Sequence, residues 1–180
     1  MDRLRRFVGF KVLELFLTRP SLEIHLNELA RHLQIARGSA KSYCDALVDE
    51  GLILESSKGN LRLFRLKRDD FAVREMTRAY YILKLKHLNV EQLAEGCVSL
   101  AVYGSFARGD IDERSDLDLL VIGEESEIYR DRILKLQDSL GREVQLTVMH
   151  YHRWETMKKE GDKFAESVLG KHVLVSGVEL

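Results

Sequence analysis

The 180-residue sequence lacks a long hydrophobic run and a large excess of charge of either sign. No apolar stretch approaches the roughly 20 residues that a membrane-spanning helix needs, so we expect no membrane partner. Basic residues near the N-terminus are not followed by a long apolar region, which argues against a signal peptide and favours a cytoplasmic location. Because the formal net charge is −1, nucleic-acid binding would need a local basic patch.

The chain also has few cysteines and no linker-like composition. Cys44 and Cys97 each lie in an apolar stretch, which predicts buried thiols of an intracellular protein rather than a disulfide pair. No Gly/Ser-rich linker, internal repeat or low-complexity tract interrupts the sequence. We therefore expect one domain, or two small domains that move together.

The most informative stretch begins with a predicted buried strand over residues 98–103. Gly104 follows this strand and allows a tight turn with a close backbone approach. Ser105 then begins a short helix. Its hydroxyl and the free backbone N–H groups of the helix start can hold an anion such as a phosphate.

A second predicted strand carries Asp116 and Asp118. Residues at i and i+2 on a strand point to the same face, so both carboxylates face the phosphate-binding turn. This arrangement predicts a Mg²⁺ site, because Mg²⁺ prefers a few carboxylates together with phosphate oxygens. In the alternative interpretation, the aspartates lie on a solvent-facing strand and Gly-Ser is an ordinary turn. The occurrence of both patterns at short spacing favours the first interpretation.

Two segments carry a family resemblance: Gly104-Ser105-Phe106-Ala107-Arg108-Gly109 and Ser115-Asp116-Leu117-Asp118-Leu119. They resemble the signature of the DNA polymerase beta-like nucleotidyltransferase superfamily, and within it the small minimal nucleotidyltransferases. The resemblance covers roughly the C-terminal half of the chain. It implies an α/β (α+β) domain, a small mixed sheet flanked by helices. The implied activity is Mg²⁺- or Mn²⁺-dependent transfer of a nucleoside monophosphate from an NTP, with ATP as first choice, to a hydroxyl.

The same resemblance implies a role for each matching residue. Gly104 and Ser105 would hold the triphosphate, and Arg108 would neutralise phosphate charge, although an arginine on a helix surface is also common. Asp116 and Asp118 would be the metal ligands and the catalytic carboxylates.

One position departs from the pattern of the active superfamily members. A strand over residues 143–149 normally supplies a third carboxylate, and Gln145 occupies that position. Glutamine is neutral and a poorer Mg²⁺ ligand, so we expect catalysis to suffer more than nucleotide binding. Glu143 lies on the same strand face and could substitute only if the strand register shifted, which we do not predict.

The N-terminal third has the order helix, helix, turn, helix, hairpin. The expected helices cover residues 4–18, 28–33 and 37–50, and the expected strands cover residues 52–56 and 61–66. Asn27 can cap the second helix, and Gly51 fits the left-handed position after the third. This order of elements, together with the sequences of residues 27–33 and 46–53, resembles winged helix-turn-helix transcription regulators of bacteria and archaea.

In those regulators the third helix enters the major groove of double-stranded DNA and the wing touches the backbone. The residues that this implies here are Arg37, Ser39, Lys41 and Ser42 on the helix, and Lys58 and Arg62 on the wing. Arginine and lysine neutralise phosphates, while serine donates hydrogen bonds. Winged helices also serve as protein–protein interaction modules. In addition, Asp45 and Asp49 reduce the net positive charge of the third helix.

A long helix is expected over residues 71–87, capped by Asp69 or Asp70. Its broad apolar face could join two domains rigidly or form a homodimer seam. We expect a winged helix-turn-helix domain over residues 1–68, a connecting helix over 69–90 and a nucleotidyltransferase-like domain over 91–180. A helix over 124–140 should pack on the sheet of that last domain.

These features leave three functional hypotheses open. The first is an enzyme that transfers a nucleoside monophosphate to an unidentified acceptor and has a DNA-binding head. The second is a catalytically weak or inactive nucleotidyltransferase fold that acts as the nucleotide sensor of a winged-helix regulator. The third is the antitoxin of a toxin–antitoxin pair, with a toxin-like partner protein. Gln145 favours the second hypothesis, whereas Gly104-Ser105 with Asp116 and Asp118 favours the first, or at least NTP binding.

Overall fold

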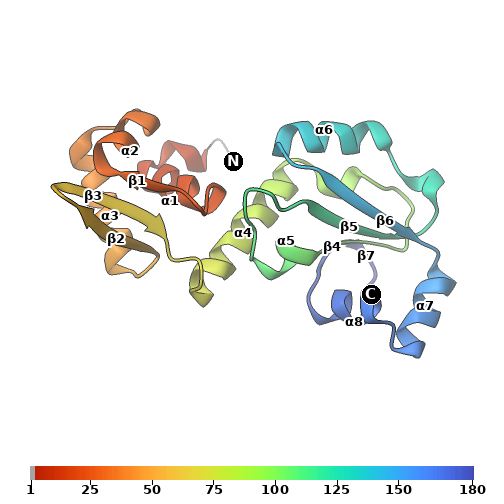
Figure 1. Ribbon diagram of the computed structural model, residues 1–180. Helices are drawn as coiled ribbons and strands as arrows, with labels where there is room; N and C mark the ends of the chain where they lie inside the picture. The colour runs from red at the N-terminus through yellow and green to blue at the C-terminus, as the bar shows by residue number, and fades with distance from the viewer. Residues whose placement is uncertain (1–2) are drawn as a thin grey trace. The chain divides into compact units, whose positions relative to one another are not determined.

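A computed structural model describes residues 3–180 of the chain (Figure 1). The chain divides into two compact units, Met1–Tyr80 and Tyr81–Leu180. The division falls inside the helix α4, Phe71–His87, and within the range that was expected to connect two domains. None of the helices within the described residues is long and apolar enough to span a membrane.

The first unit packs helices against a three-stranded antiparallel sheet of order β1-β3-β2. Its elements before α4 are η1 (Leu4–Arg6), α1 (Val8–Thr18), β1 (Glu23–His25), α2 (Leu26–Leu33), α3 (Arg37–Asp49), β2 (Ile53–Lys58) and β3 (Leu61–Leu66). Fully buried Phe16, Leu29, Ile53 and Phe64 form part of its core. The order of three helices and a hairpin confirms the predicted winged helix-turn-helix arrangement.

Two details of this unit differ from the sequence-based expectation. The prediction that Asn27 caps the second helix is wrong, because α2 already begins at Leu26. The ring Nδ1 of His25 takes the capping role and accepts a hydrogen bond from the backbone N–H of Glu28 (3.4 Å). His25 also ends β1, a strand that was not predicted because its pairing partner β3 lies far along the sequence.

The predicted first helix over residues 4–18 is also interrupted. Residues 4–6 form the 3-10 helix η1, and Phe7 is extended before α1 begins at Val8. The prediction of Gly51 after α3 is confirmed, since its φ of +70° is left-handed.

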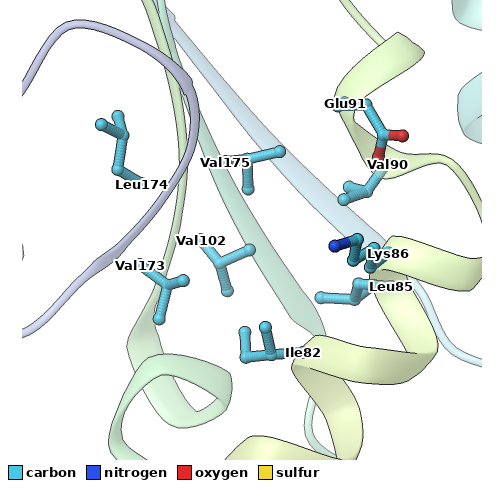
Figure 2. A pocket seen from close by; sticks show the side chains of 9 residues that line it. All are labelled: Ile82, Leu85, Lys86, Val90, Glu91, Val102, Val173, Leu174 and Val175. Carbon is cyan, nitrogen blue, oxygen red and sulfur yellow. The ribbon is translucent and has the colours of Figure 1, made fainter.

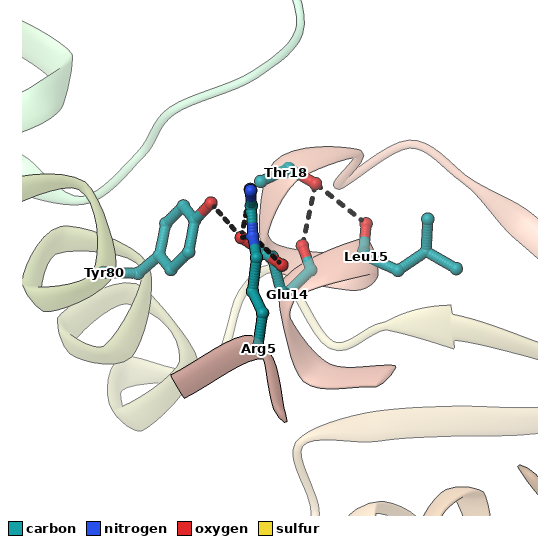
Figure 3. Close-up of polar contacts among 5 residues, drawn as sticks. All are labelled: Arg5, Glu14, Leu15, Thr18 and Tyr80. Atoms are coloured by element: carbon teal, nitrogen blue, oxygen red, sulfur yellow. Dashed lines mark hydrogen bonds and ion pairs between the residues drawn. The ribbon is translucent and has the colours of Figure 1, made fainter. Parts of the chain in front are cut away.

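Glu14 of α1 joins three segments of the first unit (Figure 3). Its carboxylate accepts hydrogen bonds from the Arg5 guanidinium (2.8 Å) and from the Tyr80 hydroxyl (2.8 Å). Thr18 donates to the backbone carbonyl of the same residue (2.7 Å). Only 13% of the Glu14 side chain is exposed, so solvent screens this ion pair less than an open surface pair. The contacts fasten η1 and α4 to α1.

The helix α4 has the predicted bounds, Phe71–His87. Of the two candidate caps, Asp70 does the capping: its Oδ1 accepts hydrogen bonds from the backbone N–H groups of Ala72 (2.9 Å) and Val73 (3.4 Å). A hydrogen bond from Lys67 lowers the pKa of the Asp70 carboxyl, which keeps the cap ionised.

The second unit contains a four-stranded mixed sheet of order β6-β5-β4-β7. Its elements after α4 are η2 (Val90–Gln92), β4 (Ser99–Tyr103), α5 (Gly104–Arg108), β5 (Leu117–Ile122), η3 (Glu125–Glu127), α6 (Arg130–Leu140), β6 (Val144–Met149), α7 (Tyr151–Glu160), α8 (Lys163–Gly170) and β7 (Val173–Gly177). The strand β4 is antiparallel to β5 and β7, whereas β5 and β6 are parallel. This mixed sheet flanked by helices confirms the predicted fold class.

Helices cover both faces of this sheet (Figure 1). On one face, Leu120 and Ile122 of β5 pack with Trp154 of α7 and Val168 of α8. The helix α6 lies on the opposite side and buries Leu136. Because side chains alternate along a strand, the residues of β5 are divided between these two cores, and the strand is held in one register.

Two expectations for this unit need correction. The predicted helix over 124–140 is broken: Glu124 and Glu127 form a capping box around the single turn η3, extended Ile128 follows, and α6 begins only at Arg130. Cys97 is half-buried rather than buried, whereas Cys44 of the first unit is fully buried as predicted.

Candidate functional site

The turn between β4 and α5 lies directly against Asp118. Tyr103, the last residue of β4, pairs with Asp118 across the antiparallel ladder, and Gly104 follows with a left-handed φ of +66°. A Cβ atom on residue 104 would overlap the Asp118 carboxylate. Glycine is therefore required twice at this position, by the backbone conformation and by the space that the carboxylate occupies.

The two aspartates differ in their position on the strand. Both aspartates were predicted to lie on the strand. Asp118 does lie on β5, but the prediction is wrong for Asp116, which is the residue just before the strand. Burial raises the pKa of the Asp118 carboxyl, the negative charge of Asp116 raises it further, and the positive charge of Arg108 lowers it. A carboxylate in this environment gains from any cation that binds beside it.

Arg108 and Ser105 lie on the short helix α5, which ends at Arg108 and is followed by the left-handed Gly109. The Arg108 guanidinium donates a hydrogen bond to Asp110 (Nε–Oδ2, 3.2 Å), and about half of each side chain is exposed. An exposed pair of this kind is weak, so Arg108 can exchange Asp110 for a stronger anion. The structure thus places Gly104, Ser105 and Arg108 in one turn beside Asp118.

Arg142 holds the loop that leads to the aspartates, a role that the sequence pattern did not reveal. Its guanidinium donates hydrogen bonds to the backbone carbonyls of Asp112 (2.6 Å) and Ser115 (2.7 Å) and to the Tyr81 hydroxyl (3.1 Å). It also lies over the rings of Tyr81 and Phe106. These contacts fix both ends of the loop 112–115 immediately before Asp116.

Gln145 lies beside Asp118, because β5 and β6 pair in parallel with these two residues in register. Both side chains therefore point to the same face of the sheet. Glu143 lies outside β6, so the strand brings no carboxylate to this position. Within residues 3–180, no group of three or more His, Cys, Asp or Glu side chains is placed to hold a metal ion. The available donors are two carboxylates and one amide.

Tyr103 extends the site on the Asp118 face. Its hydroxyl and that of Thr147 on β6 are 3.0 Å apart and share a hydrogen bond across β5. The Tyr103 ring packs edge-on against Phe164 of α8. No sequence pattern pointed to Tyr103 or Thr147, because their contact depends on the register of three strands.

A second candidate surface lies on α3 and the β2–β3 hairpin of the first unit. Two of the residues implied in DNA binding are held by carboxylates: Lys41 pairs with Asp45 (2.6 Å), and Arg62 pairs with Asp45 (2.6 Å) and Glu55 (2.6 Å). These ion pairs raise the pKa of Arg62 and lower those of Asp45 and Glu55. The cluster fastens the hairpin to α3.

The other residues implied in DNA binding remain open to a partner. Arg37, Ser42 and Lys58 are exposed, and Ser39 is half-buried. Within the described part of the chain, neither Arg37 nor Lys58 forms an ion pair. The free positive charge of this surface is therefore at the start of α3 and at the tip of the hairpin.

The overlap at Gly104 yields a stability prediction. We expect Gly104→Ala to lower the free energy of unfolding by more than Gly141→Ala, because only the first substitution must also displace Asp118. Gly141 is the matched control: its φ is +65°, but no atom lies near its Cβ position. The backbone penalty shared by both is about 1–2 kcal/mol. Equal losses in urea denaturation would contradict the close approach of turn and carboxylate.

Two protein-family models match separate parts of the chain. The model of the nucleotidyltransferase domain matches residues 86–175, half of the chain, and this range includes the Gly104 turn, both aspartates and Gln145. The model of the IclR helix-turn-helix domain matches residues 7–56. The search of curated proteins found no match.

Two solved structures match part of the chain at low similarity. A possible transcriptional regulator from Methanosarcina mazei Go1 is 12% identical, with a TM-score of 0.36, over 50% of this chain and 80% of that chain. A toxin–antitoxin protein crystallised with AMP-PNP is 16% identical, with a TM-score of 0.37, over 54% of this chain and 73% of that chain. On the match of the domain model over half of its length, the chain belongs to the nucleotidyltransferase domain family, joined here to an N-terminal helix-turn-helix domain.

Proposed function

We propose that the chain is a metal-dependent nucleotidyltransferase that transfers a nucleoside monophosphate from an NTP to a hydroxyl of an acceptor. The observation that carries this proposal is the β4–β5 register, which sets the Gly104 turn against Asp118, with Asp116 two residues earlier. The family match over residues 86–175 supports the same chemistry. In the transfer, the acceptor oxygen bonds to the α-phosphorus, the hydroxyl proton is lost and pyrophosphate leaves.

Each part of the site has a role in this proposal. Asp116 and Asp118 hold Mg²⁺ or Mn²⁺; two carboxylates completed by phosphate oxygens are a donor set that Mg²⁺ accepts. A bound ion would neutralise part of the negative charge of the triphosphate. The Gly104 backbone and the Ser105 hydroxyl hold the phosphates of an NTP, with ATP as first choice. Arg108 turns from Asp110 to the phosphates, because phosphate carries more negative charge than one carboxylate.

A second function is favoured by one observation, the amide of Gln145 beside Asp118. The missing carboxylate lowers the affinity for a second cation next to the attacking hydroxyl, while the triphosphate side keeps both aspartates. In that case the domain binds NTP without efficient transfer and acts as the nucleotide sensor of a transcriptional regulator. A toxin-like partner protein and a homodimer stay predictions, and neither is needed for either function.

The helix-turn-helix domain is proposed to bind double-stranded DNA through α3 and the hairpin. Arg37 and Lys58 would contact phosphates, and Ser39 and Ser42 would donate hydrogen bonds to phosphates or base edges. Lys41 and Arg62 form part of the same surface, but DNA must compete with Asp45 and Glu55 for their charges. Their contribution to affinity is therefore expected to be smaller than that of Arg37.

Transfer of label from α-labelled ATP to cell extract, in Mg²⁺ and then Mn²⁺, tests the enzymatic proposal. We expect slow labelling by the wild type, none by Asp118→Ala and labelling at least about tenfold faster by Gln145→Asp, which restores a metal-binding carboxylate. Gln92→Asp, which adds the same charge elsewhere, is the control. If ATP binds but neither the wild type nor Gln145→Asp labels an acceptor, the sensor function replaces the enzyme.

Binding to mixed-sequence duplex DNA at several salt concentrations tests the DNA surface. We expect Arg37→Ala to weaken binding and to reduce the salt slope by about one. Lys41→Ala should have a smaller effect. Asp45→Asn should strengthen binding, because it releases Lys41 and removes one of the two carboxylates that hold Arg62. Arg74→Ala, an exposed arginine of α4, is the control and should change nothing. Absence of wild-type binding at low salt would remove the DNA-binding assignment.

A further inference from the structure

The second unit contains a cavity that the nucleotide site does not use (Figure 2). Its volume is about 350 Å³, within the range of pockets that take small molecules. Six aliphatic side chains supplied by α4, η2, β4 and β7 line most of it: Ile82, Leu85, Val90, Val102, Val173 and Val175. The cavity lies within one compact unit, so its shape is set by the packing of that unit alone.

The strand register separates this cavity from the aspartates. Val102 of β4 pairs with Leu119 of β5 and with Val173 of β7, so these three side chains share one face of the sheet. Asp118, the neighbour of Leu119, points to the other face. A ligand in the cavity therefore does not compete for the Gly104 turn.

The lining of the cavity selects for the chemistry of its ligand. Its walls are aliphatic, and no aromatic ring among the lining residues offers a surface on which a nucleobase could stack. Lys86 of α4 also lines the cavity, and Figure 2 shows its nitrogen directed toward the space between Val102 and Leu85. Within residues 3–180 this ammonium has no carboxylate partner, and Glu91, the other charged lining residue, does not pair with it.

We propose that the cavity binds a compact aliphatic carboxylate. Its hydrocarbon chain lies against the valine, leucine and isoleucine side chains, and its carboxylate pairs with the ammonium of Lys86. Aliphatic walls beside an unpaired cation favour a ligand that carries both a hydrocarbon chain and a carboxylate over a ligand that carries only one of these groups. The site is independent of the proposed nucleotide chemistry.

NMR titration of the full chain with hexanoate, followed on valine and leucine methyl signals, tests the proposal. We expect saturable shifts at the cavity and affinity that is about tenfold lower for hexan-1-ol, which lacks the charge. Lys86→Met should bind the acid and the alcohol equally. Lys159→Met, which removes a charge from α7, is the control and should behave as the wild type. From butanoate to hexanoate, affinity should rise about fourfold per methylene.

Val175→Phe tests the location, because Val175 lines the cavity from the edge strand β7 and a phenyl ring at this position would fill the space. It should abolish hexanoate binding, whereas Asp118→Ala should leave binding unchanged. Equal wild-type affinity for hexanoate and hexan-1-ol would overturn the proposal, and so would binding that survives Val175→Phe. Methyl shifts at the cavity caused by ATP would assign it to the nucleotide instead. If Val175→Phe changed the oligomeric state and hexanoate did not bind, the surface would belong to a second copy.

Discussion

Tyr103 and Asp118 lie opposite each other in the antiparallel pair β4–β5, and this register decides which side chains meet at the candidate site. A slip of one residue would send Asp118 to the face now occupied by Val102 and Leu119, both fully buried. The apolar pattern of the two strands thus fixes the position of the carboxylate. The same register brings the Gly104 backbone so close to Asp118 that no side chain fits between them.

The charges around Asp118 affect the proposed nucleotide binding and the proposed transfer step differently. Asp118 is partly buried beside Asp116, which raises its pKa, and Arg108 is engaged with Asp110. The negative charge of the aspartates therefore has little compensation from the chain itself, and a bound cation would relieve it. Gln145, the neighbour of Asp118 in the parallel strand, adds no charge. Under the proposed function, this charge pattern impairs the chemical step more than it impairs nucleotide binding, and the size of that difference separates an enzyme from a sensor.

Local patterns predicted much of this molecule, and contacts between distant segments explain most of what they missed. The strand–turn–strand motif around Gly104 and Asp118 lies within one short stretch, so spacing and resemblance were enough to find it. Arg142 was missed because its partners are loop carbonyls about 30 residues earlier in the chain. The ion pairs of Arg62 were missed for the same reason. The sequence pattern indicated a cation on the wing, but its carboxylate partners lie on α3 and β2 and meet it only in the folded unit.

The most direct test of the central claim is calorimetric titration with a non-hydrolysable ATP analogue, with and without Mg²⁺. The account predicts saturable, Mg²⁺-dependent binding by the wild type and by Asp138→Ala, which removes an exposed carboxylate from α6. It predicts affinity at least about tenfold lower for the double variant Asp116→Ala/Asp118→Ala, because both metal ligands are gone. Equal affinity of the double variant and the wild type, or binding that does not depend on Mg²⁺, would contradict the assignment of this site.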